Sequence, residues 1–190
     1  MNRLPIALLA LAAAAACCAY AGAFDRGHAT ATEPAAEPAA ATPAEPGPGF
    51  AALFGDDLLN DKGEAADVSE LDGKTIALYF SASWCPPCRA FTPRLVDLAK
   101  KLQSDGKPFA IVLVGCDQDR QKALAYMSSH NMTGYLIPPE AASNRALSKR
   151  YHVSGIPYLA ILGPDGATID PSGRATVQSS PGTAWQKWSR

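Results

Sequence analysis

The stretch SASWCPPCRAFTP, residues 81–93, places two cysteines three positions apart with two prolines between them. A cysteine pair at this spacing occurs in structural disulfides, in halves of zinc sites, and in redox centres that make and break their own S–S bond. Each of these possibilities predicts a different kind of protein. The sequence around Cys85 and Cys88 distinguishes between them.

Two short apolar runs lie on either side of this stretch, KTIALYF at residues 74–80 and FAIVLVG at residues 109–115. Both are continuous and contain β-branched residues, which is typical of strands buried on both faces of a mostly parallel sheet. The spacing of apolar residues predicts a crossover helix over residues 87–104, with a kink at Pro93, whose ring lacks an N–H and crowds the preceding turn. The apolar positions of this helix are Phe91, Leu95, Leu98 and Leu102.

The rest of the chain continues the alternation of strands and helices. Helices are predicted over residues 119–130 and 141–151, and GIPYLAILGPDGATID at residues 155–170 predicts a β-hairpin around a Pro-Asp-Gly turn. The segment TAWQKW predicts a last helical turn that packs Trp185 or Trp188. Together these elements predict an α/β fold in which a mixed β-sheet is flanked by helices on both faces.

The N-terminal residues 1–23 have the features of an export signal peptide. One arginine precedes an apolar run, and the segment ends in small residues with A-x-A spacing. Because the apolar run is shorter than the roughly 20 residues of a membrane-spanning helix, we expect cleavage rather than an uncleaved anchor. Lipid on Cys17 or Cys18 is a further alternative, although no leucine precedes either cysteine by three positions.

Residues 24–49 are rich in Ala, Pro and Glu, and from His28 onward this segment contains no large apolar side chain to bury. Such a composition predicts a disordered, semi-stiff linker. The composition then becomes globular, so we predict one domain over residues 50–190. We therefore expect an exported protein, periplasmic or secreted, which the linker would tether to a membrane if the signal or a lipid were retained.

The overall composition excludes some classes of partner. The chain has 190 residues, of which 47% are hydrophobic, as in a soluble globular protein, and its net charge is −1. No local cluster of Lys and Arg supplies a cationic surface for phosphate backbones. We therefore expect no nucleic-acid partner, and we expect a monomer.

Counting cysteines and histidines weighs against a metal site. Without the signal peptide, the chain keeps Cys85, Cys88 and Cys116, which are too few for a disulfide scaffold. A structural zinc site needs four ligands, and one Cys pair supplies two. The histidines are widely separated in the sequence, at His28, His130 and His152. We therefore expect no metal and no cofactor.

The position of the pair favours a redox centre over a static disulfide. The pair directly follows a predicted buried strand and opens a predicted helix, where free backbone N–H groups and the helix dipole stabilise a thiolate. A dipole interaction of about 0.3–1 kcal/mol lowers a thiol pKa by up to roughly one unit. We expect Cys85, at the mouth of the helix, to be the attacking thiolate and Cys88, one turn inward, to resolve the mixed disulfide.

The two prolines between the cysteines bear on the direction of the reaction. Pro87 suits the first helical position, and we expect Pro86 to be extended because a proline follows it. Neither has an N–H to offer the sulfur, so the nearest donors are Cys88 and Arg89. We expect Cys85 to be less acidic than it would be with a glycine at position 86, which favours a reductant over an oxidant.

Residues 73–102, GKTIALYFSASWCPPCRAFTPRLVDLAKKL, resemble the active-site region of the tryparedoxin and nucleoredoxin branch of the thioredoxin superfamily. The hallmark of this branch is W-C-P-P-C-R followed by F-T-P, and the resemblance covers roughly residues 50–188. It implies a thioredoxin-like fold and a thiol–disulfide oxidoreductase.

The resemblance also implies which residues meet the substrate. Pro157 would be a cis-proline whose loop lies against the sulfurs, and Ile156 would offer backbone groups to an extended substrate. Trp84 would flank the nucleophile, and Pro86 would belong to the same substrate-binding surface.

Two departures from the family pattern concern proton transfer and the third cysteine. Many thioredoxins have a buried Asp six residues before the first active-site cysteine, and this chain has Tyr79 there, as tryparedoxins do. The proton acceptor for Cys88 is therefore unassigned, with Glu140 or water as candidates. Cys116 stands where the branch often has Trp, and we expect a small buried hydrophobe there rather than a third redox thiol.

The sequence thus predicts an exported protein-disulfide reductase that cycles Cys85 and Cys88 between dithiol and disulfide. Its substrates would be protein disulfides. Because extracellular and periplasmic spaces are oxidising, it would need a thiol electron donor, such as a membrane reductase. The alternatives are a thiol oxidase or disulfide isomerase, and a non-catalytic binding module with a structural disulfide.

Overall fold

The computed structural model describes residues 47–189, which fall within one compact unit, Ala41–Arg190. The predicted signal peptide and nearly all of the predicted linker lie outside the described residues. Among the helices of residues 47–189, none is long and apolar enough to cross a membrane.

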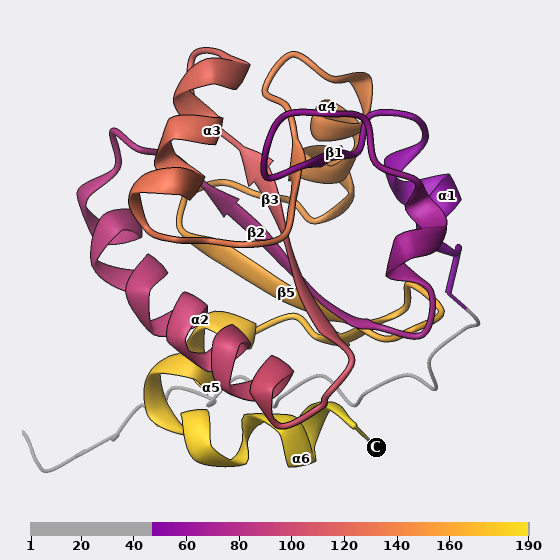
Figure 1. Cartoon of the computed structure of the whole chain (residues 1–190), viewed down its shortest axis with the longest axis vertical. Coiled ribbons are helices and arrows are strands. Elements are labelled where there is room, and N and C mark those ends of the chain that lie inside the picture. Colours follow the sequence, from indigo (N-terminus) through magenta and orange to yellow (C-terminus); the bar gives the residue numbers. More distant parts are fainter. Residues whose placement is uncertain (1–46, 190) are drawn as a thin grey trace, which may run out of the picture. The chain divides into compact units, whose positions relative to one another are not determined.

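A mixed six-stranded sheet forms the centre of the described structure (Figure 1), with the strand order β1-β4-β3-β2-β5-β6. The central strand β2 pairs in parallel with β3 and antiparallel with β5, and β3 pairs in parallel with β4. The edge strands β1 and β6 pair antiparallel with β4 and β5. The strands are β1 Leu59–Asn60, β2 Thr75–Ser81, β3 Phe109–Gly115, β4 Tyr135–Ile137, β5 Tyr158–Leu162 and β6 Thr168–Asp170.

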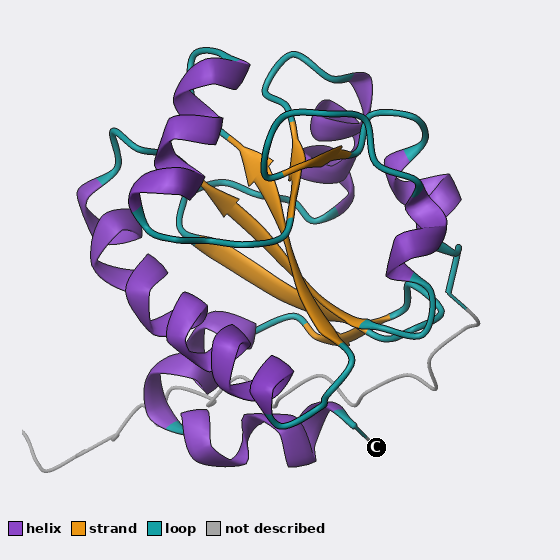
Figure 2. Ribbon diagram, viewed as in Figure 1, coloured by secondary structure: helices purple, strands orange, loops and turns teal. Residues whose placement is uncertain are grey.

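Helices cover both faces of this sheet (Figure 2), as the sequence predicted. One face packs against α2, α3, α5 and α6, and the other packs against α1 and α4. The α-helices are α1 Phe50–Phe54, α2 Pro86–Ser104, α3 Arg120–Ser129, α4 Ala142–Arg150, α5 Gly173–Ser179 and α6 Ala184–Trp188, and two 3-10 helices are η1 Val68–Leu71 and η2 Pro181–Thr183.

The central strand shows why a continuous apolar run was the right signal for this sheet. All seven residues of β2 are buried, and successive side chains point to opposite faces. Ala77 and Tyr79 pack with α2 and α3 on one face. The alternate residues pack with α1 and α4 on the other face, namely Ile76, Leu78 and Phe80. Removal of this apolar surface from water on both faces is the main term that fixes the position of β2.

The predicted helices and hairpin are confirmed to within a few residues at their ends. Helix α2 runs without interruption through Pro93. Helix α3 begins after Asp119, whose carboxylate accepts a hydrogen bond from the N–H of Lys122 at 2.8 Å. Strands β5 and β6 form the predicted antiparallel hairpin. Helices α1 and α5 were not predicted, because five and seven residues are too few to show a clear helical periodicity in the sequence.

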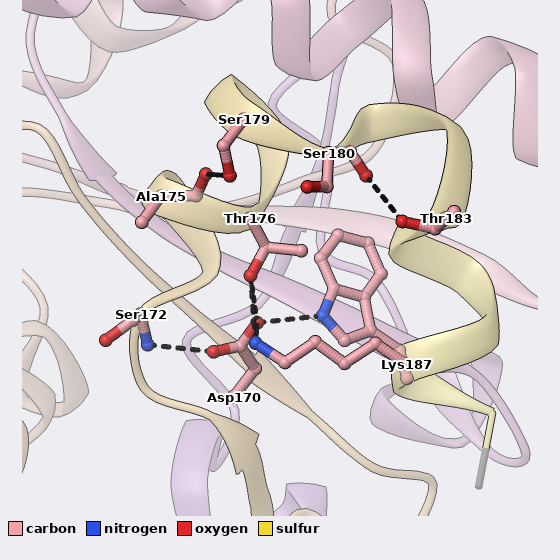
Figure 3. Close-up of polar contacts among 9 residues, drawn as sticks. Asp170, Ser172, Ala175, Thr176, Ser179, Ser180, Thr183 and Lys187 are labelled. Carbon is pink, nitrogen blue, oxygen red and sulfur yellow. Dashed lines mark hydrogen bonds and ion pairs between the residues drawn. The ribbon is translucent and has the colours of Figure 1, made fainter. Parts of the chain in front are cut away.

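The C-terminal segment is fastened to the domain by a buried carboxylate (Figure 3). Asp170, at the end of β6, is 2% exposed and accepts four hydrogen bonds. Trp188 of α6 lies in the core, where its ring stacks on Phe109 at a centroid distance of 5.8 Å, so the prediction that Trp185 or Trp188 would pack is confirmed. The donors to Asp170 are the N–H of Ser172 at 3.0 Å, the hydroxyl of Thr176 at 2.7 Å, the ammonium of Lys187 at 2.8 Å and the indole N–H of Trp188 at 3.0 Å.

Candidate active site

Cys85 and Cys88 form a disulfide at the N-terminus of α2, directly after the loop that follows β2. Cys85 is the N-cap residue, in an extended backbone conformation, and the Cα atoms of the pair are 5.2 Å apart. The N–H of Cys88 lies 3.3 Å from the Sγ atom of Cys85. Cys85 is 3% exposed and Cys88 is fully buried, so an incoming thiol or disulfide reaches Cys85 first.

The two prolines occupy the first two helical positions, which corrects one prediction. Pro86 was expected to be extended, but α2 begins at Pro86, with Pro87 as its second residue. The fixed φ of proline suits the first turn of a helix, and the extended residue is Cys85 instead. The N–H of Arg89 donates to the carbonyl of Cys85 at 3.1 Å. Of the two predicted donors, Cys88 therefore reaches the sulfur and Arg89 does not.

The loop before β5 faces the disulfide. The peptide bond between Ile156 and Pro157 is cis, as the resemblance to the thioredoxin superfamily implied. The carbonyl oxygen of Ile156 lies 3.8 Å from the Sγ atom of Cys85, and the half-buried Ile156 packs against the apolar cluster that contains both cysteines. Strand β5, which begins at Tyr158, holds this loop because it pairs with β2, the strand that leads to Cys85.

Trp84 and Pro86 border the nucleophile on its solvent side. Trp84 is 60% exposed, so its ring is not a core residue. Its indole N–H donates to the carbonyl oxygen of Cys116 at 3.0 Å, which fixes the ring beside the disulfide. Pro86 is exposed next to Cys85. The structure thus brings together the predicted catalytic and substrate-binding residues, namely Trp84, Cys85, Pro86, Cys88, Ile156 and Pro157.

A cluster of four buried hydroxyl groups lies beneath the first turn of α2. The Thr92 hydroxyl contacts the carbonyl oxygen of Cys88 at 2.9 Å, and Tyr79 contacts the Thr92 hydroxyl at 3.0 Å. The hydroxyl of Tyr126 on α3 bonds both to Thr92 and, at 3.1 Å, to Ser81. Burial raises the pKa of Tyr79 far above its usual range, so this group stays neutral. The cluster therefore holds Cys88 through its carbonyl without adding a charge.

Cys116 packs against the disulfide but is not activated. The residue is half-buried at the end of β3, in the apolar cluster that contains Cys85 and Cys88. Burial, together with the nearby charge of Asp117, raises the pKa of its thiol to about 11. A thiol with this pKa is almost fully protonated at neutral pH, which favours the expected apolar role over a third redox role.

Glu140 lies in a surface ion pair rather than among the groups that contact the cysteines. Its carboxylate accepts a hydrogen bond from Arg120 at 2.9 Å, and both side chains are about half exposed, at 52% and 48%. Residues 47–189 also contain no cluster of three or more His, Cys, Asp and Glu side chains suited to a metal ion.

Five polar residues at the site were missed by the sequence analysis. Ser83 and Asp117 are joined by hydrogen bonds across 34 positions of sequence, and Tyr126 reaches Ser81 across 45 positions. Thr92 lies within the F-T-P motif, which was used to recognise the family but gave this residue no role. An aspartate directly after a buried strand was the available signal for Asp117, because strand ends gather at the same edge of a parallel pair of strands.

Comparisons with known proteins agree with this arrangement. A family model described as thioredoxin-like matches residues 73–168. Probable nucleoredoxin 1 of Arabidopsis thaliana is 40% identical over 120 residues, which are 63% of this chain and 20% of that protein. Nucleoredoxin of Mus musculus is 35% identical over 128 residues, which are 67% of this chain and 29% of that protein. The chain therefore spans less than a third of the length of these two relatives.

Solved structures of single-domain length match over nearly their whole extent. Tryparedoxin I from Leishmania major is 36% identical with a TM-score of 0.62, over 71% of this chain and 92% of that chain. A thioredoxin from Wuchereria bancrofti is 34% identical with a TM-score of 0.60, over 72% of this chain and 95% of that chain. With its Cys pair, its cis-proline loop and these relatives, the chain belongs to the thioredoxin-like family, in the branch of the nucleoredoxins and tryparedoxins.

Proposed function

We propose that the protein is a thiol–disulfide oxidoreductase that reduces protein disulfides with the Cys85 and Cys88 dithiol. The observation that carries this proposal is the position of Cys85. Its sulfur lies at the N-terminus of α2, close to the N–H of Cys88 and to the carbonyl oxygen of Ile156 before the cis-proline. A thiolate at this point is stabilised by the helix N-terminus and lies next to backbone groups able to align a substrate.

The reaction would proceed by two thiol–disulfide exchanges. The Cys85 thiolate attacks one sulfur of a substrate disulfide, forms a mixed disulfide with it and releases the other substrate sulfur as a thiolate. The Cys88 thiolate then attacks the Cys85 sulfur, forms the intramolecular disulfide and releases the second substrate thiolate. The substrate gains two electrons and the protein loses two. A small or protein thiol must return these electrons for the next turnover.

The donors around the Cys85 sulfur support reduction as the direction of the reaction. Pro86 and Pro87 occupy the first two helical positions and have no N–H. Among the described residues, the backbone N–H that contacts the Cys85 sulfur is therefore that of Cys88. A thiolate with fewer donors is less stabilised than one with a full set. Weaker stabilisation of the reduced form makes the pair a stronger reductant.

The substrate would lie across the loop of Ile156 and Pro157, with its reactive disulfide against Cys85. An extended chain there could pair with the backbone groups of Ile156. Trp84 and Pro86, which flank Cys85 in the sequence, supply exposed apolar surface. These features suit a peptide segment rather than a deeply enclosed small molecule.

We also propose that the domain works outside the cytoplasm, exported by the signal predicted over residues 1–23. In an oxidising compartment a reductase needs a dedicated thiol donor, and a membrane reductase would meet this need. The support for this location is the composition of residues 1–49. Fractionation of cells that express the full chain, followed by mass spectrometry of its N-terminus, tests both the export and the cleavage.

Reduction of insulin by dithiothreitol tests the central activity. We expect wild-type protein to accelerate the precipitation of insulin chains, and Cys85→Ser to abolish the acceleration. Cys116→Ser is the matched control and should retain the activity. Equal rates of insulin precipitation for wild type and Cys85→Ser would contradict the proposal and support a non-catalytic binding module with a structural disulfide. Faster oxidation of reduced substrates than reduction of oxidised ones would indicate an oxidase or isomerase.

A further inference from the structure

A buried carboxylate holds the loop that leads into the active-site cysteines. Asp117 follows β3 by two positions, and only 7% of the residue is exposed. Its Oδ1 atom accepts a hydrogen bond from the backbone N–H of Ser83 at 3.0 Å and a second one from the Ser83 hydroxyl at 2.6 Å. These two bonds tie the end of β3 to the loop between β2 and α2.

The burial of this carboxylate is costly. Its Oδ2 atom is buried and has no hydrogen-bond partner among the described residues 47–189. A buried, unpaired carboxylate oxygen costs free energy, and an asparagine could accept the same two bonds from Ser83 without burying a charge. The two hydrogen bonds from Ser83 are the described contacts that offset the cost of burying this side chain.

The residue before Asp117 fastens the same loop at two further points. The N–H of Cys116 donates to the carbonyl oxygen of Ser81 at 2.8 Å. The carbonyl oxygen of Cys116 accepts the indole N–H of Trp84 at 3.0 Å. Cys116 and Asp117 thus hold the chain before Cys85 at three positions, namely Ser81, Ser83 and Trp84. Cys116 makes its contacts through its backbone, whereas Asp117 makes its two through its side chain.

We propose that Asp117 is a positioning residue for the thiol–disulfide reaction, acting through Ser83 to hold Trp84 and Cys85 in place. The inference rests on the proposed function and adds to it a residue outside the Cys pair and the cis-proline loop. Exchange between thiolate and disulfide requires the attacking sulfur to be aligned with the bond that it breaks. Loss of the bonds to Ser83 would release the loop and misplace the Cys85 sulfur and the Trp84 ring.

Three substitutions separate hydrogen bonding from charge. Asp117→Ala removes both bonds to Ser83, Asp117→Asn removes the charge and keeps an acceptor oxygen, and Ser83→Ala removes the hydroxyl bond alone. Asp119→Ala is the matched control, because Asp119 lies two positions further along and caps α3 without touching the loop. Two quantities are measured, namely kcat/KM for insulin reduction and the rate at which iodoacetamide modifies Cys85 in the reduced protein, followed by mass spectrometry.

For Asp117→Ala we expect kcat/KM to fall about tenfold, while alkylation of Cys85 becomes at least threefold faster because the loosened loop exposes the sulfur. Asp117→Asn should restore kcat/KM to within about threefold of wild type. Ser83→Ala should lie between wild type and Asp117→Ala. The double variant should be no worse than Asp117→Ala alone, because both changes act through one pair of bonds.

Wild-type rates in Asp117→Ala would overturn the proposal. A loss in Asp117→Asn as large as that in Asp117→Ala would overturn it too, since charge and not hydrogen bonding would then be responsible. If Asp117→Ala does not fold, Ser83→Ala decides, because an unchanged alkylation rate there contradicts the proposed coupling. Alkylation needs only a free thiol, so absence of insulin reduction by wild type would reject the proposed function while the alkylation rates still judge Asp117.

Discussion

The backbone N–H of Cys88 points at the sulfur of Cys85, 3.3 Å away, within the turn that opens α2. An N-cap side chain accepts from the amides of the second and third helical residues, which are Pro87 and Cys88 here. Because Pro87 has no amide N–H, the sulfur has lost one of its two natural donors. The structure therefore places the missing N–H donor at Pro87, whereas the sequence analysis expected a glycine at position 86 to make Cys85 more acidic.

The first prediction concerns the acidity of Cys85. Pro87→Ala restores the amide of the second helical residue, and we expect the pKa of Cys85 to fall by about one unit, since a hydrogen bond to a charged group is worth about 1.5–3 kcal/mol. Pro86→Gly should lower the pKa less. The pH dependence of Cys85 alkylation measures both variants, and an unchanged or raised pKa in both would refute the link between the prolines and a reducing pair.

The second prediction concerns the hydroxyl cluster under α2. Thr92→Val removes the group that contacts the Cys88 carbonyl and joins Tyr79 to Tyr126. Loss of these buried bonds should lower the free energy of unfolding by about 1–3 kcal/mol. Urea denaturation measures this change. Thr183→Val, at an exposed position near the C-terminus, is the control, and an equal effect of the two substitutions would show that the cluster adds no more stability than an exposed hydroxyl.

The third prediction concerns the third cysteine. With a pKa raised to about 11, Cys116 is protonated at neutral pH, and we expect iodoacetamide to modify it at least tenfold more slowly than Cys85 at pH 7.5. Cys116→Ser should leave insulin reduction within about twofold of wild type. Rapid modification of Cys116, or a mixed disulfide that joins it to Cys85 or Cys88, would instead indicate a third redox thiol.

The fourth prediction concerns acid stability. Burial of Asp170 raises the pKa of its carboxyl, but the hydrogen bonds from Lys187, Trp188, Thr176 and Ser172 outweigh that effect, so the net pKa is lowered from its ordinary value of 3.8. A lowered folded-state pKa stabilises the protein above the unfolded-state value, and this stability is lost as pH falls through the folded-state pKa.

Asp170→Asn should therefore lose stability at pH 7 relative to wild type, by about 1.5–3 kcal/mol, because the charge-assisted hydrogen bond from Lys187 is lost. The difference between the two proteins should shrink as the pH is lowered from about 5 toward the folded-state pKa. Thermal unfolding between pH 3 and pH 7 follows this change. A difference that is constant with pH would mean that the Asp170 charge does not stabilise the C-terminal segment.

The elements that sequence patterns predicted well are those with a strong local signal. Residues 109–115 form β3 over the predicted range, because a run of seven apolar or small residues is stable only between two layers. The amphipathic spacing of α2 was equally clear. Helix α5 could not be found, because only Val177 of its side chains reaches the main core and its position depends on Asp170.

The residues of the candidate site also fall into those that the sequence could predict and those that it could not. Cys85 and Cys88 were identified from their spacing, and Ile156 and Pro157 from a family resemblance. Asp117 could not have been paired with Ser83 from the sequence, because the contact depends on the parallel register of β2 and β3, which sets Ser81 beside Gly115. The conformation of Pro86 was wrongly predicted because the extended preference of a residue before proline was weighed above the suitability of proline for a first helical turn.

The reduction potential of the Cys85 and Cys88 couple tests the proposed reductase most directly. Equilibration of the protein with glutathione or dithiothreitol mixtures, followed by alkylation and mass spectrometry, gives this value. We predict a potential of about −270 mV or below, as in reducing members of the fold. The reason is that one backbone N–H, that of Cys88, contacts the Cys85 sulfur in the described residues. A potential near about −120 mV would contradict the account and identify an oxidant.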